Sequence, residues 1–365
     1  MDSYKKKSNR REFINIGALS VGLLISTRLP SSNKMEATSK TGKFNNIPTL
    51  TGDIDPSQLG TTLMHEHILF FSSPAPDDRG FKPIPEDLRA ESVEFAAALL
   101  NDAARVGIET VVDLTPFRPI DMYEEIAKRT PVKIVASTGF YRRSKTPKWM
   151  ADMDDEYQIE EHMLKEAVEG IGGTKIRAGI IKIAEESAIF SNWEKKVFRA
   201  AARIQNKIDI PIATHTGNAL EQFELLINSG ANPSRVFFSH VDVSRKGNIG
   251  DLIKIVKAGA YIEVDTFGQD FYTPKSELVS FLRSVCDSGF AKNVFISIDS
   301  NWHWANGKKM FEGSEAPAFD PNASNRTFAY MITDAVPWLL KSGFSIKEIN
   351  TFLIDNPRNF FTGKS

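Results

Sequence analysis

Short apolar runs alternate with amphipathic segments along this chain from about residue 46 onward. Each apolar run is rich in β-branched residues, which indicates a strand. The predicted strands lie near residues 65, 112, 136, 180, 213, 238, 263 and 297. Helical periodicity predicts helices between and after them, at 86–106, 120–129, 157–171, 194–206, 218–229, 249–257, 275–289, 327–341 and 346–354.

Strands that are each followed by a helix predict an α/β fold of the (β/α)8 TIM barrel type. A doubly wound open sheet is the alternative, and it needs a glycine-rich phosphate loop after its first strand. The sequence has no such loop after the run near residue 65. The barrel is therefore the predicted architecture.

Histidines stand at the end of the first predicted strand. Alternate residues of a strand share a face, so His65 and His67 point the same way and Glu66 points the other. Two imidazoles on one face can hold one metal ion. Three more residues with metal-ligating side chains end the fifth, sixth and eighth predicted strands: His215, His240 and Asp299. A barrel collects the carboxyl ends of its strands at one face, so we expect all of these side chains to converge.

A lysine interrupts the fourth predicted strand. Lys182 lies within Ala178–Ala184, a run that is otherwise apolar on both faces, and burying an unpaired ammonium group there is costly. One interpretation pairs the lysine with a carboxylate such as Glu263 or Asp265. The other is that the neutral amine reacts with carbon dioxide to form a carbamate, whose two oxygens can bridge two metal ions.

Composition narrows the possible functions. The chain has 365 residues, a formal net charge of -1 and 41% hydrophobic residues, which is typical of a globular protein with a large core. No basic excess indicates nucleic-acid binding. Cys286 is the only cysteine, so a disulfide within the chain is impossible and a thiolate metal site is disfavoured.

The N-terminal segment has the pattern of an export signal. Two adjacent arginines, Arg10 and Arg11, precede an apolar stretch at residues 14–25 that is short for a membrane span. Paired arginines in this context are typical of a twin-arginine signal; a basic tail before a short buried helix is the alternative. We predict a signal peptide and linker over 1–40, a single barrel domain over 41–365, a periplasmic or secreted location, and no stable membrane anchor.

Seven motifs together resemble the phosphotriesterase family of the amidohydrolase superfamily, including its lactonases. They are GTTLMHEH, STGFY, AGIIKIA, ATHTG, FSHVD, EVDTFG and SIDS. The resemblance covers about residues 47–362, and the closing NPRNFF resembles the family's C-terminal helix. All six expected ligand types occur in the family's order.

The resemblance implies a centre with two divalent metal ions. The more buried ion would be held by His65, His67 and Asp299. The more exposed ion would be held by His215 and His240. A carbamate on Lys182, formed from CO2, and a hydroxide would bridge the ions; zinc is the expected metal, with manganese, cobalt or iron as alternatives. The hydroxide would attack the substrate while Asp299 takes the proton.

The resemblance also implies residues of a substrate pocket. Tyr141 stands where lactonases carry a tyrosine and triesterases a tryptophan, so it favours a carbonyl substrate. Asp265 matches the family's strand-seven aspartate, and Thr266 follows where lactonases carry an arginine and triesterases a histidine. Glu263 and Val243 depart from the family pattern as well. Together these departures weaken the assignment of either a lactonase or a phosphotriesterase activity.

Further pocket residues are expected in a long loop at about residues 300–326. Trp302 and His303 lie there and are candidates to contact substrate, although the aromatic residues could instead pack against the barrel rim. The first predicted function is a hydrolase of lactones or carboxylic esters; a phosphotriesterase is the alternative, and a non-catalytic barrel with a vestigial site is the third. The predicted partner is a small-molecule substrate, and a homodimer is possible because relatives are often dimers.

Overall fold

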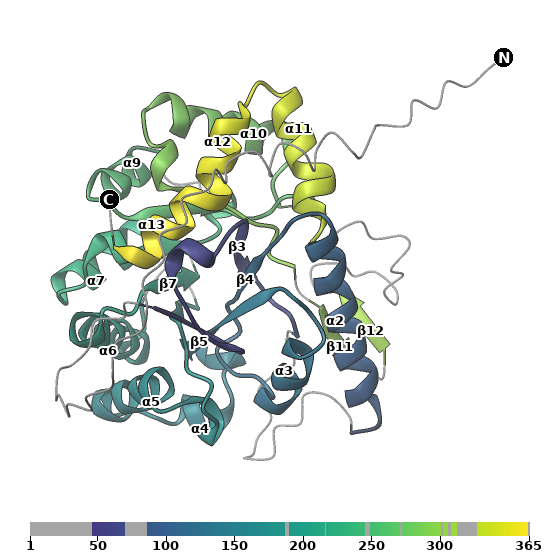
Figure 1. Ribbon diagram of the computed structural model, residues 1–365. Coiled ribbons are helices and arrows are strands. Elements are labelled where there is room, and N and C mark those ends of the chain that lie inside the picture. The colour runs from purple at the N-terminus through teal and green to yellow at the C-terminus, as the bar shows by residue number, and fades with distance from the viewer. Residues whose placement is uncertain are drawn as a thin grey trace, which may run out of the picture. The chain divides into compact units, whose positions relative to one another are not determined.

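One parallel sheet organises the structure, a computed structural model that describes residues 46–69, 86–186, 190–215, 217–244, 249–270, 272–300, 302–305, 308–311 and 327–363. Strands that follow one another in the chain are also neighbours in the sheet, from β3 to β10 (Figure 1). They are β3 (Thr62–Glu66), β4 (Thr110–Asp113), β5 (Lys133–Phe140), β6 (Ile180–Ala184), β7 (Ile212–His215), β8 (Val236–Phe238), β9 (Tyr261–Val264) and β10 (Val294–Ile296).

Helices follow the strands and surround them, as Figure 1 shows for α2, α3, α5 and α6. The α-helices are α2 (Arg89–Arg105), α3 (Ile120–Ala127), α4 (Lys148–Ala151), α5 (Glu156–Val168), α6 (Asn192–Ile208), α7 (Ala219–Asn228), α8 (Val241–Ser244), α9 (Ile249–Lys257), α10 (Lys275–Asp287), α11 (Val336–Lys341), α12 (Ile346–Asn350) and α13 (Asn356–Thr362). Short 3-10 turns lie at Pro56–Gln58, Glu86–Leu88, Arg143–Lys145, Ile171–Gly173, Pro233–Arg235 and Ala291–Asn293, and π-helical turns at Met331–Ala335 and Thr351–Asp355. This order confirms the predicted TIM barrel.

Side chains join the first and last strands of the sheet. Ser297, just beyond β10, accepts hydrogen bonds at its Oγ from the backbone N–H groups of Met64 (2.9 Å) and His65 (3.1 Å). The Glu66 carboxylate accepts from the N–H groups of Ile298 (3.1 Å) and Ser300 (2.8 Å). These contacts bring the end of β3 beside the segment that carries Asp299.

Two apolar clusters lie on either side of the strands. The larger one fills the space between sheet and helices and includes Ile296 and Ile298, as their alternation with Ser297 predicts. The smaller one lies inside the barrel at the amino-terminal ends of the strands. There the rings of Tyr261 and Phe295 are stacked with centroids 4.9 Å apart. Apolar side chains fill this end of the barrel, and the polar residues lie at the other end, where the strands have their carboxyl ends.

Two hairpins were not expected from the sequence. The first pairs β1 (Ile47–Thr49) with β2 (Gly52–Ile54), and the second pairs β11 (Trp302–Ala305) with β12 (Lys308–Phe311). The second lies in the segment predicted as a loop. Strands this short contain too few residues for a two-residue alternation to be recognised.

Residues of the predicted export signal lie outside the described residues, so the signal and the domain boundary stay predictions. Within the part of the chain that the structure describes, no helix has both the length and the apolar composition needed to cross a membrane.

Candidate metal centre

Three of the expected ligands form a compact group at the seam between β3 and β10. The ring centroids of His65 and His67 are 5.4 Å apart, so both histidines face the same space, as their spacing predicts. Asp299 Oδ1 lies 3.6 Å from His65 Nε2 and 3.3 Å from His67 Nε2. Three ligand-type atoms from two strands thus surround one point.

The other two histidines lie beside this group. His215 Nδ1 and His240 Nε2 face each other at 3.0 Å, and the His240 ring centroid is 4.9 Å from that of His65. Residues distant in sequence therefore form one buried cluster at the carboxyl ends of the strands. The barrel has brought together all six side chains that the sequence singled out.

Backbone strain marks two members of the cluster. Among the described residues other than glycine, only Asp209, His240 and Asp299 have positive φ; the values for the latter two are 55° and 46°. Such a conformation is unfavourable for these residues and persists where the surrounding contacts hold it. Strain of this kind concentrates at functional sites, and here it aims both side chains into the cluster.

Carboxylates beneath the cluster hold two of the histidines. Asp265 accepts from His240 Nδ1 at 2.9 Å and lies 2.9 Å from His65 Nδ1. Glu263 Oε2 is 3.2 Å from the same His65 nitrogen. Burial, and then the neighbouring Asp265 charge, raise the pKa of Glu263 well above its usual range. Carboxylates that grip the second nitrogen of a histidine fix the ring and favour metal binding by the first.

A separate contact orients His67. Its Nδ1 lies 2.8 Å from Thr115 Oγ1, and the Thr115 backbone N–H donates to Asp113 at 2.8 Å. Asp113 also accepts from the N–H of Ile68 at 2.9 Å. The end of β4 therefore fixes both the ring of His67 and the backbone that follows it.

Lys182 reaches the centre of the cluster from β6. It is fully buried, with Nζ 3.3 Å from His65 Nε2. Burial lowers the pKa of the ammonium to about 8, although the charges of Asp299, Glu263 and Asp265 favour the protonated form. A lysine in this environment deprotonates far more readily than one at the surface.

Burial favours the neutral form of two of the imidazoles, and this is the form that binds a metal ion. Burial lowers the pKa of His65 and His215 well below the usual value, and neighbouring positive groups add to this effect. Burial acts in the same direction on His240, but the Asp265 charge raises its pKa overall. The pKa of Asp299 is lowered despite its burial, because His67 donates to it and cationic groups surround it. Nitrogen and carboxylate donors so arranged fit a divalent metal ion.

Two sets of three residues have ligand-type side-chain atoms that lie within 4.8 Å of one another. One set is His65, His67 and Asp299, and the other is His65, His240 and Asp265. The first is the set expected for the more buried ion. The second joins His65 and His240 through Asp265, and it does not include His215, which was expected beside His240.

The expected pocket residues have different surroundings. Tyr141 is half-buried and packs edge-on against the His215 ring, with centroids 5.1 Å apart. Asp265 is fully buried below the histidines, and Thr266 donates from its hydroxyl to Asp242. Tyr141 thus lies at the edge of the cluster, and Asp265 lies beneath it. Trp302 lies on β11, and the side chains of that hairpin lie outside the described residues, including that of His303.

The sequence analysis did not identify Arg142, which follows Tyr141 at the end of β5. Its Nη2 lies 2.8 Å from His215 Nε2. The sequence signal was present: a cation directly after a strand end that already carried a candidate residue. Glu185, three residues after Lys182, was also missed; it accepts from the Asn218 N–H and fixes the loop after β7.

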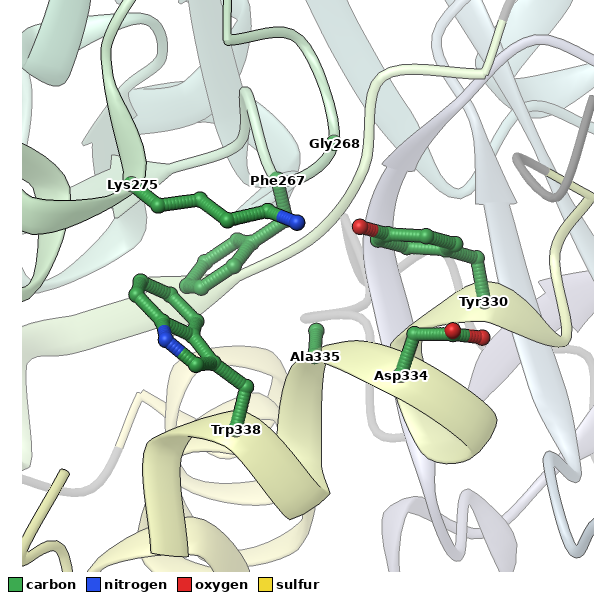
Figure 2. A pocket seen from close by; sticks show the side chains of 7 residues that line it. All are labelled: Phe267, Gly268, Lys275, Tyr330, Asp334, Ala335 and Trp338. Carbon is green, nitrogen blue, oxygen red and sulfur yellow. The ribbon is translucent and has the colours of Figure 1, made fainter. Parts of the chain in front are cut away.

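A small cavity of about 130 Å³ lies on the loop after β9. Figure 2 shows Lys275 extending across Phe267 toward Tyr330, with Trp338 and Asp334 on the α11 side. None of its lining residues is an expected ligand or pocket residue. Two of them, Phe267 and Gly268, directly follow Thr266 in the chain.

A TIM barrel with a buried cluster of histidines and carboxylates at the carboxyl ends of its strands defines a class of metal-dependent hydrolases. The model of the phosphotriesterase family matches residues 45–361. The chain therefore belongs to the phosphotriesterase family, as its motifs indicated. That family is metal-dependent, and its members include hydrolases of different bonds.

Three similar proteins illustrate this range. The phosphotriesterase homology protein of Escherichia coli K12 is 30% identical over 84% of this chain and 99% of its own length. The N-acetyltaurine hydrolase of Salmo salar is 25% identical over 87% of this chain and 98% of its own. A solved structure concerning organophosphate hydrolysis engineered from a weak promiscuous lactonase template has a TM-score of 0.71 and 29% identity, covering 87% of this chain and 99% of its own.

Proposed function

We propose that this protein is a dinuclear metal-dependent hydrolase that attacks a carbonyl carbon, in a lactone or a carboxylic ester. The observation that carries the proposal is the convergence of six ligand-type side chains, from five strand ends, in one buried cluster. A vestigial site would have lost some of them. Two divalent ions, zinc by preference, would lower the pKa of a water molecule and polarise the substrate's carbonyl oxygen.

Residues of the chain would hold the two ions and accept the proton. His65, His67 and Asp299 would hold one ion, and His215 and His240 the other. Lys182 would carry the carbamate: burial lowers its pKa to about 8, so a larger fraction of the amine than at the surface is neutral and can react with CO2. Asp299, whose pKa the neighbouring His67, His240 and Lys182 lower, would take the proton from the attacking water.

The carbonyl preference rests on Tyr141 and on relatives. Tyr141 packs against His215 at the edge of the cluster and occupies the lactonase-type position. The name of the Salmo salar relative denotes hydrolysis of an amide, which is also a carbonyl compound. The engineered structure is named for both a lactonase and organophosphate hydrolysis, so a phosphotriesterase remains the competing function.

Steady-state kinetics on γ- and δ-lactones and aryl esters beside an aryl phosphotriester tests this choice. We expect kcat/KM to favour the carbonyl compounds by at least about a hundredfold, roughly 2.7 kcal/mol of transition-state preference. Equal or faster turnover of the phosphotriester would establish the competing function instead.

Elemental analysis tests the metal centre separately. We expect two metal ions per chain, with His65→Ala and Asp299→Ala losing metal and activity together. His162→Ala is a matched control, because His162 packs against Phe140 and Trp149, away from the cluster. Active protein without metal would refute the dinuclear centre.

A further inference from the structure

Hydrogen bonds fix the backbone of Arg142 at the edge of the metal cluster. Its carbonyl accepts hydrogen bonds from the Lys145 N–H at 2.9 Å and from Thr146 Oγ1 at 3.0 Å. The segment after β5 is therefore a folded turn, and the Arg142 side chain starts from a fixed point. Its guanidinium carbon lies 5.7 Å from the centre of the Tyr141 ring.

The guanidinium group has unused donors beside the cluster. Nη2 contacts His215 Nε2 at 2.8 Å, while Nε is buried without a hydrogen-bond partner. Within the described residues, no ion pair joins Arg142 to a carboxylate. A half-buried cation with an unsatisfied N–H and no counter-ion favours an anionic ligand.

The hydrogen-bond directions connect Arg142 to the two histidines and the carboxylate beneath them. Arginine only donates, so His215 Nε2 accepts and the proton of the neutral ring is on Nδ1. That Nδ1–H faces His240 Nε2 at 3.0 Å, and His240 Nδ1–H donates to Asp265 at 2.9 Å.

His215 and His240 would hold a metal ion, and Arg142 contacts the first of them. The guanidinium group lies beside this pair with its buried Nε–H unsatisfied, so it can bind an anionic ligand at the edge of the cluster.

We propose that Arg142 recognises an anionic group of the substrate, a carboxylate, beside the bond that is hydrolysed. The inference rests on the proposed function, because it describes the substrate of the same site. A guanidinium group can make two parallel hydrogen bonds to a carboxylate, which adds geometric selectivity to the charge attraction. The Tyr141 ring, whose centroid is 5.7 Å from the guanidinium carbon, stabilises the cation.

A pair of activated esters that differ only in charge tests the proposal in metal-loaded protein. The esters are 4-nitrophenyl hydrogen glutarate and its neutral methyl ester. We expect Arg142→Met to lower the ratio of kcat/KM for the charged over the neutral ester at least about tenfold, and Arg142→Lys to lower it less. Arg143→Met is the matched control: this exposed neighbour donates to the Ala151 carbonyl, and its removal should leave the ratio unchanged.

Calorimetric binding of glutarate to the same metal-loaded variants provides a readout without turnover. We expect the dissociation constant to rise at least about tenfold in Arg142→Met and to stay constant in Arg143→Met. An unchanged constant in Arg142→Met, or no glutarate binding by the wild type, overturns the proposal. If no variant hydrolyses either ester, the proposed carbonyl hydrolysis fails, and glutarate binding alone decides the role of Arg142.

Discussion

Glu66→Gln is the substitution that best tests how the barrel closes around its metal cluster. The Glu66 carboxylate is fully buried and accepts from the backbone N–H groups of Ile298 (3.1 Å) and Ser300 (2.8 Å). Asp299 lies between these two residues. One side chain therefore joins the two edges of the sheet and fixes the backbone of a predicted metal ligand.

The expected cost follows from these two hydrogen bonds. A bond to a charged acceptor contributes about 1.5–3 kcal/mol, and a buried donor left without an acceptor costs about 1–3 kcal/mol. Glutamine retains one acceptor oxygen, but its amide N–H₂ would face a backbone N–H. Loss of the Glu66 charge also removes a repulsion that raises the pKa of Glu263, which offsets part of the cost. We expect a net loss of about 3 kcal/mol in the free energy of unfolding.

Urea denaturation followed by tryptophan fluorescence measures this loss, and elemental analysis measures metal retention. We expect weaker metal retention, because the altered hydrogen bonds flank Asp299. Glu109→Gln is the control: its carboxylate is 55% exposed, so its effect should stay within about 0.5 kcal/mol. A destabilisation by Glu66→Gln below about 1 kcal/mol, together with unchanged metal content, would refute the reasoning.

Three further predictions address single features. Lys182→Ala should lose activity and regain part of it with acetate or propionate, which supply two oxygens to the vacated space; full activity without added acid would exclude the carbamate. Burial raises the pKa of Glu185 to about 7 from 4.5, so its contribution to stability is present below about pH 4.5 and lost as the pH rises through 7. Relative to Glu185→Gln, the wild type should lose on the order of 3 kcal/mol between pH 4.5 and 8, measured by urea denaturation at each pH; a constant difference would contradict this. Joint replacement of Arg10 and Arg11 by lysine should retain the protein in the cytoplasm, and fractionation that shows normal export would rule out the twin-arginine signal.

Much of the architecture could be predicted from local patterns. Apolar runs separated by amphipathic segments indicated all strands of the barrel and its main helices, because burial on one face imposes a period that is visible in sequence. The same alternation placed His65 and His67 on one face. The motifs around the strand ends then indicated the family, and a family model that matches residues 45–361 confirms it.

The contacts within the site depended on the tertiary structure. Glu263 and Asp265 were recognised as polar residues on one strand, yet only the closed barrel shows both of them beneath His65. The Arg142 contact with His215 joins two strand ends 73 positions apart, and the place of Arg142 after a strand end does not identify its partner. Sequence patterns report which face of an element is buried, since that depends on neighbours along the chain. Which charged group meets which depends on strand register and on how the loops fold back over the barrel, and these are set only when the whole sheet closes.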